Sequence, residues 1–329
     1  MKRCIVLLCI IILLTGVYVI AKSPSSRSNM PMALYTMNNG TLATTMFSGM
    51  AEWWNYEDYP LCIWQPFDPT NSLLYMGDFW ACNNEHAVGS PEGYPMINGW
   101  FNVNGSSGLY RPGQPGWPAT EPVYSEHDTL AYFTDHGRIG LQVKRHTMMW
   151  NGAIDADYFI VQYAVTNMTT SNLTDLYIGR MDDFDLVGMG STYMDNVVGS
   201  NQVDKTVWSR DRLNFPIYCW VGLQGLSFNI TGMNYWDILS DPHSEAGVIA
   251  RMHGQWWLPI STAGDWRLLA VHGPFGLTAG TTRNFTFAIA FGTDYNDMLS
   301  NLNRARTRYQ QGSPQVETTT LGLIKGIYR

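Results

Sequence analysis

The sequence predicts an all-β protein, an antiparallel β-sandwich with long loops and one C-terminal helix. Runs rich in β-branched and aromatic residues recur between clusters of Gly, Pro, Asn and Asp, at spacings too short for helices. Apolar side chains alternate along the clearest runs, as they do in a strand that has one face in a core. The length that follows an N-terminal apolar run is enough for one large β domain or two β subdomains.

The clearest strand covers Asp157 to Asn167, and one alternating set in it is predicted to face the core: Phe159, Val161, Tyr163 and Val165. Leu176 to Arg180 follows after a polar turn, so we expect these two strands to form an antiparallel hairpin. Near the end, Asp265 to His272 and Thr282 to Phe291 flank a Gly-containing turn and are predicted to be neighbouring strands. One helix is predicted from Asp294 to Gln311, where apolar residues recur at helical spacing: Met298, Leu302 and Ala305.

The N-terminus has the plan of a signal peptide. Lys2 and Arg3 precede an apolar run from Ile5 to Ala21, and a peptidase that prefers small side chains would cut after Ala21. The alternative is an uncleaved anchor, since the run is just shorter than the roughly 18 residues that span a bilayer. Either way we expect the rest of the chain to be extracytoplasmic, secreted or at the cell surface.

Four segments follow from this organisation. We expect a signal peptide over 1–21, a polar linker over 22–32, the β-sandwich over 33–312 and a tail over 313–329. After the leader we find no segment that could span a membrane.

Composition narrows the classes of partner. Charged residues make up 14% of the chain and the formal net charge is −7, so a basic patch for nucleic acid or for an anionic membrane is not expected. The sequence has no P-loop, no G-x-S-x-G elbow and no G-x-G-x-x-G after a strand, which excludes nucleotide-dependent chemistry.

The predicted mature part has three cysteines: Cys62, Cys82 and Cys219. Export would permit a disulfide without requiring one. Cys62 and Cys82 lie in one segment and are the candidate pair, and the alternative is three buried thiols.

Five stretches match a pattern that consists of a strand ending in TN, a strand with YxG, a D-x-D acidic loop and a GPF-x-L-x-x-G turn. They are YSEHDTLAYFTDH (124–136), GLQVKRHTMMW (140–150), DADYFIVQYAVTN (155–167), LTDLYIGRMDDFDLVG (173–188) and LLAVHGPFGLTAGTTRNFTFAIAFG (268–292). In these stretches the chain resembles a family of uncharacterised exported bacterial β-rich surface or secreted proteins. The resemblance implies the fold class and the compartment, and no residue roles. Members often carry C-terminal sorting domains, and we expect none in this chain.

The densest acidic cluster is Asp182, Asp183 and Asp185, after a predicted strand. Oxygen ligands this close together are what Ca²⁺ prefers. The alternative is a network of Asx turns that caps strands. The same carboxylates could also supply the general acid and base that hydrolyse a glycosidic bond.

Tryptophan is the second candidate for function. The faces of a sugar ring stack on indole, so exposed Trp side chains beside Asn and Asp would form a glycan-binding platform. The alternative is that the rings fill a core, because adjacent Trp residues on a strand point to opposite faces. The stretch from Gly89 to Pro122 is a long loop system that suits binding. The candidate ligand-binding residues are Trp53, Trp54, Trp100, Trp117, Trp256 and Trp257.

Three functions are therefore compatible with the sequence. The first is a non-catalytic exported protein, structural or adhesive, that binds glycan through exposed aromatics. The second is a carbohydrate-active hydrolase, which predicts two carboxylates about 5 to 10 Å apart in a cleft with exposed Trp. The third is a self-assembling surface subunit, in which the apolar end from Leu321 to Arg329 completes a neighbour's sheet.

Overall fold

The computed structural model describes residues 34–47, 52–53, 62–67, 72–89, 100–103, 109–115, 117–186, 193–212, 219–254 and 260–312. The predicted leader and linker (1–32), the tail (313–329), Trp54, Trp256 and Trp257 lie outside these residues. No helix in the described part of the chain is long and apolar enough to cross a membrane.

The all-β prediction is confirmed. About 49% of the described residues are in strands and 14% are in helices, and the strands form three antiparallel sheets. The largest sheet has nine strands in the order β13-β14-β15-β18-β11-β10-β9-β7, and β8 also pairs with β9. Their bounds are Asn196–Asn201 (β13), Thr206–Asp211 (β14), Trp220–Gly225 (β15), Thr282–Gly292 (β18), Tyr158–Asn167 (β11), Leu141–Met149 (β10), His127–Thr134 (β9), Phe101–Asn102 (β7) and Leu109–Tyr110 (β8).

A six-stranded sheet has the order β16-β17-β12-β5-β3, with β6 beside β5, and a small sheet contains β1, β2 and β4. The bounds in the six-stranded sheet are Gly232–Asp237 (β16), Trp266–Leu277 (β17), Leu173–Asp183 (β12), Met76–Cys82 (β5), Glu52–Trp53 (β3) and Ala87–Val88 (β6). Those in the small sheet are Leu34–Asn38 (β1), Leu42–Phe47 (β2) and Cys62–Trp64 (β4). The described helices are α2 (Glu245–His253) and α3 (Tyr295–Gly312), with short 3₁₀ turns at Tyr193–Asp195 (η2) and Ile238–Ser240 (η3).

The two large sheets pack face to face. The predicted inward set of β11, including Phe159 and Tyr163, shares one hydrophobic core with Phe79 and Ile178 of the six-stranded sheet. The rings of Phe79 and Tyr163 stack across the interface, with their centroids 4.2 Å apart. The other face of β11 is buried as well, which the alternation did not predict, because α3 covers part of it through Leu302 and its neighbours. The outer face of the six-stranded sheet is covered in the same way by α2.

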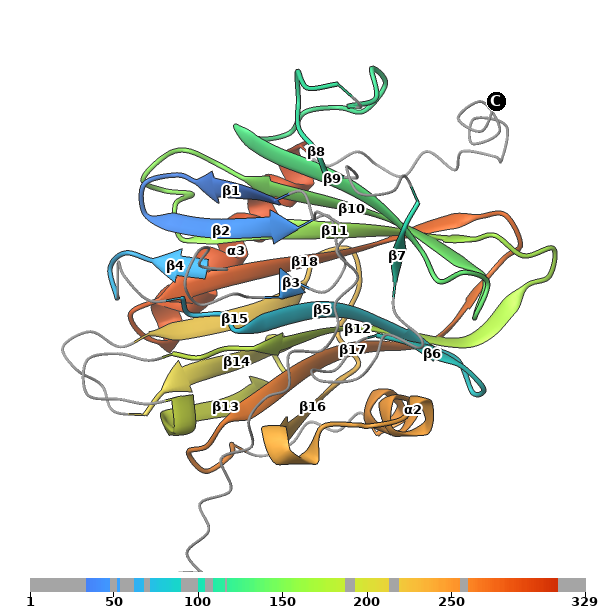
Figure 1. Cartoon of the computed structure of the whole chain (residues 1–329). Coiled ribbons are helices and arrows are strands. Elements are labelled where there is room, and N and C mark those ends of the chain that lie inside the picture. The colour runs from blue at the N-terminus through green and yellow to red at the C-terminus, as the bar shows by residue number, and fades with distance from the viewer. Residues whose placement is uncertain are drawn as a thin grey trace, which may run out of the picture. The chain divides into compact units, whose positions relative to one another are not determined.

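Both predicted strand neighbours are wrong. β11 does not pair with β12, and β17 does not pair with β18. Each turn carries the chain from one sheet to the other, so that β11 pairs with β18 and β12 with β17 (Figure 1). At the first crossing, the side-chain amide of Asn167 donates to the carbonyls of Ser171 and Leu277, which ties the two turns together.

The helix near the C-terminus is confirmed, since α3 buries Met298, Leu302 and Ala305 against the nine-stranded sheet. Helix α2 was not predicted. It has only nine residues and begins at the N-cap Ser244, whose hydroxyl accepts a hydrogen bond from the Gly247 amide at 3.1 Å.

Cys62, Cys82 and Cys219 are buried, and none of them is in a disulfide in the described structure. Cys62 belongs to the core between the sheets, whereas Cys82 faces the cluster under α2, so the Cys62–Cys82 pair does not form. Burial raises the pKa of the Cys82 thiol to about 12.

Candidate functional site

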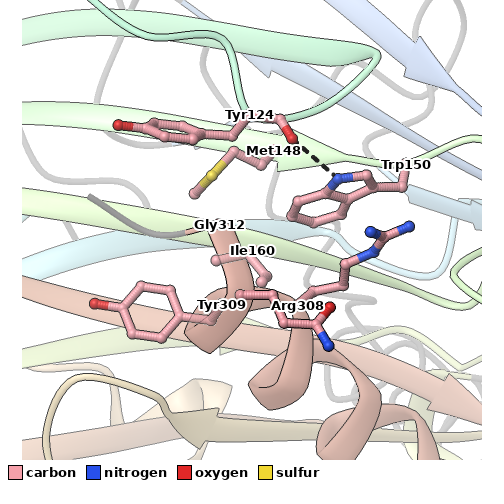
Figure 2. Close-up of a pocket in the computed structure, with 8 residues that line it drawn as sticks. Tyr124, Met148, Trp150, Ile160, Arg308, Tyr309 and Gly312 are labelled. Carbon is pink, nitrogen blue, oxygen red and sulfur yellow. Dashed lines mark hydrogen bonds between the residues drawn. The ribbon is translucent and has the colours of Figure 1, made fainter. Parts of the chain in front are cut away.

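A pocket opens on the outer face of the nine-stranded sheet, beside the C-terminal end of α3 (Figure 2). It contains about 440 Å³ of empty space, part of it open to solvent. Met148 on β10 and Ile160 on β11 are Cα partners and form its floor. Its described lining is Tyr124, Met148, Trp150, Ile160, Arg308, Tyr309, Gln311 and Gly312.

Aromatic rings form the walls of this pocket. Tyr124 and Tyr309 stand on opposite sides with their hydroxyl groups toward the same end, and Trp150 and Arg308 lie at the other end (Figure 2). Two segments far apart in sequence therefore build it: Tyr124 comes from the loop before β9, and Tyr309 from the last turn of α3. The three rings surround an apolar floor, which suits a flat ligand that has apolar faces.

Hydrogen bonds hold the Trp150 end in place. The Trp150 indole donates to the carbonyl of Tyr124 at 3.1 Å. The Arg308 guanidinium lies 5.9 Å from the Trp150 ring centroid and donates from its Nε to Asp155 at 2.8 Å. Asp155 also accepts from the Tyr158 hydroxyl at 2.5 Å. Burial raises the pKa of Tyr158, and this hydrogen bond raises it further, so the phenol stays neutral.

Trp117 is a predicted ligand-binding residue near the pocket. Its half-buried ring stands edge-on to His146, with the centroids 5.8 Å apart, and the Tyr124 ring lies 5.3 Å from the same His146. The Trp117 indole donates to the Glu121 carbonyl at 3.1 Å, and the Glu121 carboxylate accepts from Lys144 at 2.7 Å. The long loop thus brings one predicted ligand-binding residue to the pocket's edge.

Of the other predicted tryptophans, Trp100 has a described side chain, and it does not lie at the pocket. Trp100 is buried, its indole donates to the Phe79 carbonyl at 2.7 Å, and it belongs to the core between the sheets. Trp53 lies in β3, and its side chain is outside the described part, as are Trp54, Trp256 and Trp257. Trp150, Tyr124 and Tyr309 were missed, because nothing local to each of them shows that the fold brings them together.

The predicted acidic cluster divides between the two faces of β12. Asp182 faces the interior, where the Arg180 guanidinium lies 2.8 Å from it and also donates to the Tyr163 hydroxyl at 2.9 Å. Asp183 faces the opposite way, where Arg267 donates to it. We expected the three carboxylates either to bind one ion together or to lie on one turn. Asp182 and Asp183 instead point to opposite faces, as adjacent residues of a strand do.

A different group of carboxylates forms instead. Asp183, Asp185 and Asp265 are buried, and each has an oxygen within 4.8 Å of the others. Arg267 donates to Asp183 at 2.5 Å and to Asp241 at 2.9 Å. Asp265 was missed because it joins the cluster only through the pairing of β17 with β12, which places Arg267 beside Asp183.

Burial raises the pKa of Asp183 well above its usual range. Arg267 opposes that shift, while Asp185, Asp265 and Asp241 add to it. Carboxylates this close together raise one another's pKa, and hard cations prefer oxygen ligands. The arrangement is therefore suited to hold a hard cation or to keep one carboxyl protonated.

Comparison with known proteins shows the fold and no family. No family model and no curated protein matches the sequence. A bacterial glucoamylase complexed with acarbose is similar in structure, with a TM-score of 0.50 and 10% identity over 85% of this chain and 35% of that one. The chain thus spans about a third of the glucoamylase. An Escherichia coli K12 protein assigned as an aldose 1-epimerase has a TM-score of 0.40 at 10% identity, over 80% of this chain and 100% of that one. A polysaccharide lyase has a TM-score of 0.33 at 11% identity, over 81% of this chain and 33% of that one.

Proposed function

We propose that the protein is an exported carbohydrate-active protein that binds a saccharide in the pocket between Tyr124 and Tyr309. The observation that carries this proposal is the arrangement of three aromatic rings around the apolar floor of Met148 and Ile160. A pyranose presents apolar C–H faces to such rings and polar hydroxyls at its rim.

The shared fold with part of a glucoamylase is consistent with this proposal and supports it at the level of architecture. The aromatic pocket supplies the chemical argument. Of the predicted tryptophans with described side chains, Trp117 adjoins this pocket and Trp100 does not.

A hydrolase is the second candidate, and one observation favours it. Asp183, with its raised pKa, lies beside Asp185 and Asp265, and glycoside hydrolysis needs a protonated and an ionised carboxyl together. Burial of all three favours the binding role first, because a substrate must reach both carboxyls. The hydrolase candidate predicts cleavage of chromogenic glycosides that Asp183→Asn abolishes.

A glycan array and titration calorimetry test the binding proposal on residues 22–329. We expect wild-type binding to at least one saccharide, and we expect Trp150→Ala and Tyr309→Ala each to weaken it by about tenfold or more, as loss of a stacking ring does. Trp266→Ala is the matched control, since this half-buried ring lies at the start of β17 in the other sheet. Saccharide binding that survives both pocket substitutions, in variants that melt as the wild type does, would contradict the proposal.

A further inference from the structure

A row of buried polar side chains crosses the sheet next to the pocket floor. His146 on β10 is the Cα partner of Gln162 on β11, which is the partner of Thr286 on β18. These residues are 1%, 4% and 0% exposed. His146 and Gln162 are two residues from Met148 and Ile160 along their strands, so the row lies about 7 Å from the floor on the same face.

Hydrogen bonds connect the row to the pocket wall. The Gln162 amide donates to the Thr286 hydroxyl at 3.4 Å, and the Thr286 hydroxyl in turn donates to the hydroxyl of Tyr309 at 3.4 Å. On the opposite wall, the ring of Tyr124 contacts His146. Tyr124 and Tyr309 direct their hydroxyls toward one end of the pocket (Figure 2). The row and the two hydroxyls therefore supply the polar groups next to an otherwise apolar cavity.

Three buried polar atoms in this region have no hydrogen-bond partner within the described structure: both ring nitrogens of His146 and the Tyr124 hydroxyl. The nearest carboxylates lie beyond hydrogen-bond length, Asp128 at 3.6 Å and Glu121 at 3.8 Å from His146. Each has a partner of its own, since Asp128 accepts from the Tyr124 amide at 2.6 Å and Glu121 accepts from Lys144. Buried polar groups without partners are rare in folded proteins, and a ligand is one reason to retain them.

We propose that the Tyr124 hydroxyl, His146 and Gln162 form the hydroxyl-binding end of the pocket, and that the ligand is a neutral pyranose. This inference rests on the proposed saccharide binding. Phenol, imidazole and amide groups both donate and accept hydrogen bonds, as sugar hydroxyls do. Asp128 and Glu121 beside His146 disfavour an anionic sugar at this end.

Contact with His146 requires a small movement of its cover. The rings of Trp117 and Tyr124 lie against it and leave it 1% exposed. A sugar ring over Met148 and Ile160 reaches the row once these rings shift along the face of β10. Trp117 belongs to the loop before β9, so ligand binding changes the surroundings of its indole.

Nuclear magnetic resonance titration of residues 22–329 tests this inference, with methyl pyranosides of glucose, galactose and mannose and their monodeoxy analogues as probes. The variants are Tyr124→Phe and Gln162→Met, which remove polar groups and keep side-chain bulk. We expect each to weaken binding of the preferred glycoside about fivefold, as the loss of one hydrogen bond does. We also expect each variant to bind one deoxy analogue as well as the wild type does, because the missing hydroxyl is the one that the removed group contacts. The Trp117 indole resonance should move on binding. Tyr235→Phe, in the other sheet, is the matched control.

The outcomes separate the two levels of the argument. If both variants bind every probe as the wild type does while Trp150→Ala abolishes binding, the pocket holds the sugar in another orientation and this inference is overturned, although the proposed function stands. If the wild type binds none of the probes and no glycan on the array, both are overturned.

Discussion

Asp183 shows how a single strand position concentrates charge. Its carboxyl is buried beside three others, and Arg267 offsets the rise in its pKa only in part. The folded protein holds this proton to a higher pH than the unfolded chain, in which an Asp pKa is about 3.9. Folding stability from this group is therefore fully present below about pH 3.9 and is lost as the pH rises through the raised folded-state pKa.

The corresponding prediction compares wild type with Asp183→Asn in urea denaturation between pH 5 and pH 7. Between pH 5 and pH 7, the free energy of unfolding should fall more in the wild type than in the variant. The difference should be about 1.4 kcal/mol for each pH unit of this interval that lies below the folded-state pKa of Asp183. Asp175→Asn, at an exposed position, should leave the wild-type slope unchanged. Equal slopes in wild type and Asp183→Asn would show that the Asp183 carboxyl is ionised throughout.

Calcium binding stays a prediction. The expected ligands are now Asp183, Asp185 and Asp265, so that Asp265 replaces Asp182. Two oxygens bound to one Ca²⁺ at about 2.4 Å can be at most about 4.8 Å apart, which the cluster satisfies. We expect 1 mM CaCl₂ to raise the melting temperature of residues 22–329 by several degrees, as about 2.7 kcal/mol of binding at a hundredfold excess over Kd would do. Asp265→Asn should remove the shift and Asp175→Asn should retain it. A melting temperature that neither calcium nor a chelator moves would exclude the ion.

The sequence marked two members of the acidic cluster by a local signal. Asp183 and Asp185 were marked because they are closely spaced acidic residues at the end of a predicted strand. Asp265 and Tyr309 were not, because each reaches its site through a partner far along the chain. Trp100 was assigned to a ligand and fills the core, since composition does not distinguish an exposed indole from a buried one.

At the scale of elements, the two crossings between sheets explain why both hairpin predictions failed. A polar turn between two strands with alternating apolar residues indicates that the chain reverses direction. The same pattern fits a hairpin within one sheet and a crossing to the opposite sheet. The choice is made by the core: β11 and β12 turn their apolar sets toward one another across the sandwich. The turn between β17 and β18 also crosses between the sheets. As a result, β11 pairs with β18 in one sheet and β12 pairs with β17 in the other.

Gly292 tests how closely α3 packs on the end of β18. A Cβ at this position would lie 2.7 Å from the backbone Cα of Met298, and backbone cannot move aside as a flexible side chain does. The second turn of α3 is also anchored to β18, because the Asn301 amide donates to the Phe291 carbonyl at 2.7 Å. We expect Gly292→Ala to destabilise the protein by about 1 to 3 kcal/mol in urea denaturation. Gly276→Ala, where the nearest atom would be 3.5 Å from the added Cβ, is the control and should have little effect. An unchanged stability in Gly292→Ala would mean that α3 shifts freely on the sheet.

At the scale of the whole molecule, the low charge content has a structural reason. Apolar and aromatic side chains fill three layers: the core between the sheets, the cluster under α3 and the cluster under α2. A two-layer sandwich buries one face of each strand, but β11 is buried along its entire length on both faces. The all-β class followed from alternation, whereas the additional layers depended on where α2 and α3 dock, which alternation does not encode.

The self-assembly proposal makes the last prediction at this scale. In the described structure, the buried residues of the hydrophobic clusters end at Ala305, and Tyr309 packs against one cluster. We expect that folding does not require Leu321 to Arg329. We expect residues 22–320 to melt at the same temperature as residues 22–329. If the apolar end completes a neighbour's sheet, light scattering should give a larger mass for the longer chain and a monomer for the shorter one. Leu323→Asp in the longer chain is the control for length, and it should also give a monomer, because a charged side chain disfavours a buried strand position. A large fall in the melting temperature of the shorter monomer would place the tail in its own core, and equal masses would exclude assembly through the tail.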